Sequence, residues 1–141
     1  MTDERMMALL LRTADAVEKR LEEVLGTVAL SFTKYGALTH LVQAGEPLSL
    51  SELAARVICV RSNISQLVDR LEADGLVCRE EDPRDRRCVR AALTPLGRER
   101  QAAGAERVQE LRRQVAEILS GVDSAALERG LVALGGRPPE L

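Results

Sequence analysis

The fold of this chain is constrained most by one helical segment. This segment stops at a glycine and is followed directly by two stretches rich in β-forming residues. In RSNISQLVDRLEADGL the apolar residues take the i, i+3, i+4 and i+7 positions of one buried face: Ile64, Leu67, Val68 and Leu71. Gly75 is placed to end this helix. The stretches LVCRE and CVRAALT follow, on either side of a charged tip at Pro83. Strand-forming residues flanking a turn predict a β-hairpin.

Helical patterns fill the remainder of the chain. Two long segments carry apolar residues at alternating steps of three and four, the spacing of a seam that faces another helix. These are Leu10, Ala14, Val17, Leu21, Val24 and Val28 in the first, and Val108, Leu111, Val115, Ile118 and Val122 in the second. The expected helix N-caps are Ser31, Ser49, Thr94 (followed by Pro95) and Asp123. The sequence therefore predicts four helices, a hairpin and two further helices, a mainly α fold with a small β-hairpin.

Composition and charge narrow the function. The 141 residues fit one domain with helical extensions, and 30% charged residues favour a well-solvated surface. Net charge is -2, but residues 56–100 hold ten Lys+Arg against eight Asp+Glu, or +2, which leaves ten against fourteen, or -4, elsewhere. We therefore expect an anionic partner to meet the middle of the chain. We read no signal peptide and no membrane span, and expect a cytoplasmic protein that contacts no membrane.

Catalytic and metal-binding signatures are missing from the sequence. His40 is the single histidine, and the three cysteines form no CxxC motif, so we expect no metal and no cofactor. There is no nucleophile motif, no phosphate loop and no pair of carboxylates in an evident pocket. We expect a protein that is not an enzyme.

The face opposite the apolar stripe of the helix in RSNISQLVDRLEADGL is polar. The residues expected to point outward include amides, hydroxyls and a guanidinium, and they are Ser62, Asn63, Ser65, Gln66, Asp69 and Arg70. Such groups can read base edges in the major groove of DNA. The alternative is a face that is merely solvated.

The motifs in this region resemble those of the MarR family of bacterial transcription regulators. They are LVDRLEADGLV, then Asp85, Arg87, Leu93 and Thr94 at the spacing DxRxxxxxLT, then PLG, and the resemblance is close over residues 30–97. It implies a winged helix-turn-helix DNA-binding region over 30–97, flanked by dimerisation helices in 1–29 and 98–141. A homodimer that binds double-stranded DNA is implied, most simply as a repressor, with half-sites about 10 base pairs apart in a near-palindromic operator.

The resemblance also suggests residue roles. The recognition helix would face DNA with Arg61, Ser62, Asn63, Ser65, Gln66 and Arg70. In the wing, Arg87 would enter the minor groove and Asp85 would brace it, while Arg84 and Arg86 are assigned to phosphates. The chain has Val60 where the family usually places a Ser or Thr cap, so Ser62 is the expected N-cap of a helix that starts slightly later.

Two mechanisms of regulation are compatible with the sequence. Regulators of this family usually answer to small anionic or phenolic effectors, for which Arg12, Tyr35 and His40 are the polar candidates; a core role for Tyr35 and His40 is the alternative. A thiol switch is the competing mechanism, using Cys59, Cys78 and Cys88. Cys78 and Cys88 lie five residues either side of Pro83, so a symmetric hairpin would bring them near cross-strand register, although purely structural thiols are favoured. A winged helix used only for protein contacts is a further alternative.

Overall fold

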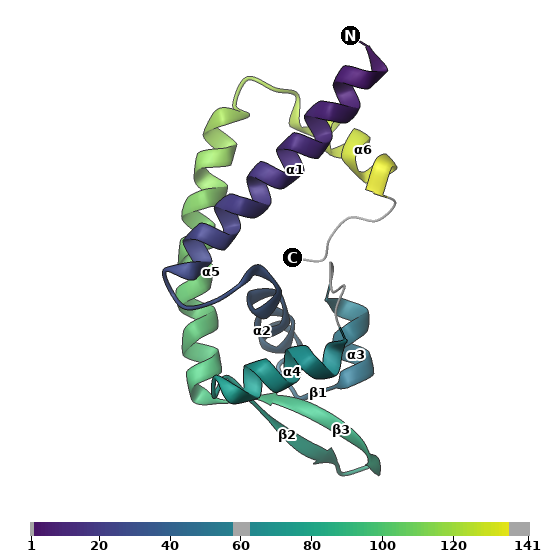
Figure 1. Ribbon diagram of the computed structural model, residues 1–141, viewed down its shortest axis with the longest axis vertical. Helices are drawn as coiled ribbons and strands as arrows, with labels where there is room; N and C mark the ends of the chain where they lie inside the picture. The colour runs from purple at the N-terminus through teal and green to yellow at the C-terminus, as the bar shows by residue number, and fades with distance from the viewer. Residues whose placement is uncertain (1, 58–62, 136–141) are drawn as a thin grey trace.

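The computed structural model describes residues 2–57 and 63–135 and shows a mainly helical chain with one small sheet (Figure 1). Its helices are α1 (Asp3–Gly26), α2 (Phe32–Ala44), α3 (Leu50–Arg56), α4 (Ile64–Ala73), α5 (Pro95–Ile118) and α6 (Ser124–Gly135). Its strands are β1 (Leu48–Ser49), β2 (Val77–Asp82) and β3 (Asp85–Leu93). The predicted order of helices and hairpin is confirmed.

Side-chain caps fix where the helices begin, as the sequence predicts. Ser31, Ser49 and Thr94 accept hydrogen bonds from the amides of Lys34, Glu52 and Gly97 at 3.2, 3.1 and 3.0 Å. Asp123 accepts one from Ala126 at the start of α6. Each cap satisfies an amide that has no partner within the helix.

The sheet has one strand more than the predicted hairpin. Strands run antiparallel in the order β1-β3-β2, with Leu48 opposite Ala91 and Val77 opposite Leu93. β1 is two residues long, too short to show an alternating pattern in sequence, and it is defined only by its pairing with β3. The hairpin is thereby anchored to the segment between α2 and α3.

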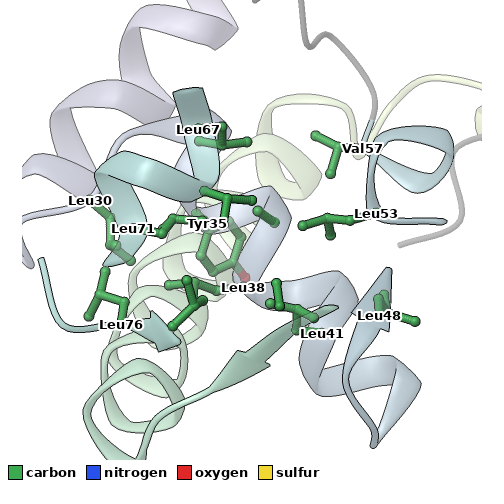
Figure 2. Packing of buried hydrophobic residues seen from close by; sticks show 14 of the residues in the cluster. Leu30, Tyr35, Leu38, Leu41, Leu48, Leu53, Val57, Leu67, Leu71 and Leu76 are labelled. Atoms are coloured by element: carbon green, nitrogen blue, oxygen red, sulfur yellow. The ribbon is translucent and has the colours of Figure 1, made fainter. Parts of the chain in front are cut away.

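The core surrounds α2. Leu38 and Leu41 of this helix are buried. Leu25 of α1 belongs to the same buried cluster, and leucines from α3, α4 and the turn before β2 pack around α2 (Figure 2): Leu53, Leu71 and Leu76. Tyr35 belongs to the same cluster. The winged-helix portion therefore buries its own apolar faces within one chain.

A tight contact joins the end of α4 to the start of α5. Gly75, at φ 75°, ends α4 in a left-handed conformation, and the amide of Leu76 bonds back to the Leu71 carbonyl at 2.9 Å. Thr94 donates its hydroxyl to the Gly75 carbonyl at 2.6 Å and its amide to the Leu76 carbonyl at 3.1 Å. Gly97 lies so close that an added Cβ would sit 1.9 Å from the Leu76 oxygen. These contacts explain why the LTPLG sequence follows the hairpin.

The two long seams are only partly covered. The C-terminal half of α1 packs along α5 in the same chain, which buries Leu25, Val108 and Leu111. Large apolar side chains elsewhere on α1, at the end of α5 and on α6 are exposed, among them Met7, Leu11, Ile118, Leu127 and Leu134. In α6 every side chain is exposed or partly exposed, and none is buried.

Among the described residues, no helix has both the length and the apolar character needed to cross a membrane.

Candidate nucleic-acid interface

Helix α4 begins one residue later than the sequence suggested, and its cap is Asn63. The Asn63 Oδ1 accepts a hydrogen bond from the Ser65 amide at 2.9 Å, and the Asn63 carbonyl accepts from Gln66 and Leu67. The predicted cap, Ser62, and the predicted DNA contact Arg61 lie outside the described residues. Since the amide oxygen of Asn63 already accepts one hydrogen bond in the cap, its NH2 group is the freer partner for a base.

The polar face of α4 is as the amphipathic pattern predicts. Leu67, Val68 and Leu71 are buried on one side, while Gln66 and Arg70 are exposed on the other. Ser65 is partly buried. The exposed face therefore presents an amide and a guanidinium, with the wing immediately next to the helix in Figure 1.

The wing tip is asymmetric. Glu81 pairs with Val89, but the next residue, Asp82, pairs with Asp85. The residues between, Arg86 to Cys88, are therefore extra on β3 and form a bulge. Arg84, Arg86 and Arg87 are all exposed at this tip.

Two aspartates hold the tip. Asp85 Oδ1 accepts the Arg87 amide at 3.1 Å and lies 3.5 Å from Arg87 Nε. Asp82 Oδ1 accepts the Arg84 amide at 2.9 Å. The Arg87 side chain is 95% exposed, so its guanidinium extends into solvent while Asp85 contacts its backbone amide and Nε. An arginine oriented in this way loses less conformational freedom when it enters a groove.

Sequence reasoning missed Arg79, which ties the wing to α4. Its guanidinium lies 2.7 Å from Asp69 Oδ1 and 3.2 Å from Glu72 Oε1, and its NH2 donates to the Ser65 carbonyl at 3.2 Å. Its backbone amide donates to Glu72 Oε2 at 3.0 Å. A signal was present, because Asp69 and Glu72 are i, i+3 acids on α4 and Arg79 lies near the start of β2, the next element.

The thiols do not form the predicted pair. The register places Cys78 opposite Ala92, four residues from Cys88 on β3, because the bulge shifts the strands. Four residues of strand span about 13 Å, too far for a disulfide. Both thiols are exposed, so neither is a buried structural thiol. Asp85 raises the pKa of Cys88, chiefly by its charge, and accepts a hydrogen bond from its Sγ at 3.6 Å. Cys59 lies outside the described residues.

The three candidate effector residues are not brought together at a cavity. Tyr35 and His40 are buried in α2, and Arg12 is exposed on α1. An open apolar hollow of about 1340 Å³ lies between α1, the start of α2 and α6, and its polar lining comes from Thr13, Glu18 and Thr33. None of the three candidates lines this hollow. Within 2–57 and 63–135, no three His, Cys, Asp or Glu side chains are grouped to hold a metal.

Several known proteins are similar to this chain in sequence and in fold. The MarR family model matches residues 30–89. The Bacillus subtilis HTH-type transcriptional regulator YkoM is 37% identical over 67 residues, which are 48% of this chain and 43% of that relative. The transcriptional regulator BldR from Sulfolobus solfataricus is 32% identical and has a TM-score of 0.72, covering 98% of this chain and 100% of that one.

A further solved structure contains nucleic acid. The transcriptional repressor CouR, bound to a 23-mer DNA duplex, is 26% identical with a TM-score of 0.79, covering 90% of this chain and 89% of that one. Its similarity extends over the helices, the wing and the long flanking segments. The motifs at the wing, the family model and these neighbours agree, and the chain belongs to the MarR family of DNA-binding transcription regulators.

Proposed function

We propose that this protein is a repressor that binds a near-palindromic operator as a homodimer and is released by a small effector. The observation that carries the proposal is the bulged tip of the hairpin that follows α4, where Asp85 holds an exposed Arg87. A narrow minor groove concentrates negative potential and attracts such an arginine. Gln66 and Arg70 are the described side chains best exposed to read bases in the adjoining major groove.

A second subunit is part of the proposal. Helix α6 buries none of its side chains, and Met7, Ile118 and Leu127 are exposed on the same extensions. Contiguous apolar surface of this kind marks an association site. Two copies related by a twofold axis would cover it and would present two α4 helices to two half-sites.

The hollow favours a phenolic effector over an anionic one. Its lining is mainly apolar, and among the described residues that line it the one charged side chain is Glu18, which repels a carboxylate but accepts a hydrogen bond from a phenol hydroxyl. We therefore place the effector in the hollow rather than at Arg12, Tyr35 and His40. Phenol should release the protein from operator DNA at a lower concentration than benzoate does. In Glu18→Leu the concentrations of phenol and benzoate needed for release should be closer to each other.

DNA binding is tested by salt titrations of fluorescence anisotropy on upstream DNA of its own gene and on scrambled DNA. Arg87→Ala should weaken binding to both DNAs and lower the salt dependence, because a charge is lost from the minor groove. Gln66→Ala should instead reduce the preference for operator by about 1 to 3 kcal/mol. Gln66 serves better than Asn63 here, since replacing Asn63 also removes a helix cap.

The wing assignment has its own control. Arg12→Ala changes an exposed arginine on α1, far along the chain from the wing, and should leave the salt dependence as in wild type. Equal affinity and equal salt slope in Arg87→Ala and wild type would overturn the assignment of the tip to DNA.

A further inference from the structure

Helix α4 carries two acids on the side that adjoins its DNA-facing residues. Asp69 follows Ser65 by one turn, and Glu72 follows Asp69 by three residues. Carboxylates at a DNA surface repel phosphates, and like charges brought together suppress binding. Unless they are neutralised, these acids oppose the approach of α4 to DNA.

Arg79 of β2 meets both acids at once. One guanidinium nitrogen lies against Asp69 and also reaches the Ser65 carbonyl, and the other lies against Glu72. The second oxygen of Glu72 takes the backbone amide of Arg79 itself. The Arg79 side chain is 27% exposed, while those of Asp69 and Glu72 are 64% and 44% exposed, so the guanidinium is shielded from solvent more than the two carboxylates are.

We propose that Arg79 is a positioning residue for DNA binding, which masks Asp69 and Glu72 and fixes the roll of α4 relative to the wing. The inference rests on the proposed function. With α4 held in this way, Gln66 and Arg70 on the helix and Arg87 on the wing keep fixed relative positions. The planar fork of an arginine spans several acceptors, whereas lysine is a point charge.

A second arginine in the same sheet provides a matched control. Arg90 on β3 pairs with Glu80 on β2 at 2.6 Å, and its side chain is 24% exposed. Among the hydrogen bonds and ion pairs described for Arg90, none reaches α4. It therefore matches Arg79 in burial and in partner type, without the link to the recognition helix.

The experiment compares Arg79→Gln, Asp69→Asn, their combination and Arg90→Gln on operator and scrambled DNA, from about 50 to about 200 mM salt. Arg79→Gln should weaken binding to both DNAs about tenfold at low salt, because two carboxylates are unmasked. This defect should shrink as salt rises and screens them. Adding Asp69→Asn should restore most of the loss, and Arg90→Gln should bind like wild type.

Several outcomes would overturn the inference. Wild-type affinity in Arg79→Gln, or no recovery in the double variant, would show that masking of Asp69 is not the role of Arg79. An equal loss in Arg90→Gln would assign the effect to the sheet as a whole. Circular dichroism checks that each variant is folded. If Arg79→Gln does not fold, Arg79→Lys replaces it, and we expect this variant to prefer operator over scrambled DNA less than wild type does. An unchanged preference in Arg79→Lys would contradict the inference. Absence of DNA binding by the wild type would instead overturn the proposed function itself.

Discussion

The winged-helix portion and the flanking helices differ in how much apolar surface they bury: the first buries its apolar side chains within the chain, and the second leaves many of them exposed. Around α2 the leucines of several elements pack against one another, and the contact between the end of α4 and the start of α5 leaves no space for even one methyl group at Gly97. In α6 no side chain is buried, and an added Cβ at Gly130 would meet nothing within 4 Å. Both regions are helical and rich in Leu, Val and Ala.

This difference shows which part of the chain needs no partner to cover its apolar side chains. A region that buries its apolar face can fold alone, whereas amphipathic helices with an uncovered face need a partner to be stable. The packed region is also the one that carries the polar face of α4 and the wing. Substitutions should therefore act on folding in one region and on assembly in the other.

The largest expected effect is that of Gly97→Ala. The new Cβ would sit 1.9 Å from the Leu76 carbonyl oxygen, a backbone atom that cannot move without disturbing the end of α4. We expect a loss of about 3 kcal/mol or more in the free energy of unfolding, measured by urea denaturation.

Gly130→Ala is the matched change in the flanking region. Because the site is open and helical, alanine should stabilise α6 by up to about 1 kcal/mol. Both variants are compared at one protomer concentration, since association contributes to stability. Similar losses in the two would erase the contrast between the regions.

The next effect concerns assembly. Ile118→Glu combined with Leu127→Glu places charges on exposed apolar positions of α5 and α6, 66% and 37% exposed in the single chain. We expect light scattering at micromolar concentration to report a dimer for wild type and a monomer for this variant, because burying unpaired carboxylates is costly.

The combined variant Ser120→Glu and Arg129→Glu tests whether added negative charge alone separates the subunits. It changes exposed polar residues on the same segment and should leave the dimer intact. A monomeric wild type, or a dimer that survives the paired glutamates, would contradict the assignment of this surface.

A smaller effect lies at the junction of the two regions. Ala29, between α1 and α2, has φ 58°, a left-handed conformation that is unfavourable for any residue with a Cβ. Ala29→Gly should raise the free energy of unfolding by about 1 kcal/mol, net of the greater freedom of glycine in the unfolded chain. Ala116→Gly, at an exposed helical site on α5, should lower it by a similar amount. The same sign for both would show that the loop is not strained.

The smallest effect is chemical and concerns the thiol at the bulged tip. Asp85 raises the pKa of Cys88, so at a given pH less of it is the reactive thiolate. In a chain with Cys59 and Cys78 replaced by serine, Asp85→Asn should speed alkylation by iodoacetamide at pH 8. Arg86→Gln is the control and should not speed it. A faster reaction in the unmodified tip than in Asp85→Asn would revive a thiol switch at this position.

Sequence predicted the parts of the fold that are set by local chemistry. Caps at Ser31, Ser49 and Thr94 and the stop at Gly75 all depend on residues within a few positions of one another. The buried stripe of α4 follows from periodicity alone. These features need no knowledge of what lies across the molecule.

The remainder depends on contacts that the sequence does not state. β1 exists only because β3 lies beside it, and the bulge at Arg86 to Cys88 follows from how the strands align over their whole length. The same shift separates Cys78 from Cys88. Arg79 was missed because its partners are on another element. The sequence also does not tell whether a polar side chain lies at a cavity or in a core, and the structure buries Tyr35 and His40.

The bulge makes the wing tip a separable part. The strand pairing from Val77 to Glu81 does not depend on the bulge, because the three extra residues, Arg86 to Cys88, are outside the pairing and only Asp82 and Asp85 pair beyond them. Residues can therefore be exchanged, added or removed there without turning any core side chain to the wrong face of the sheet. A protein built in this way can acquire a different reach or charge at the tip of its hairpin in a few mutational steps, while the sheet that supports the tip keeps its register.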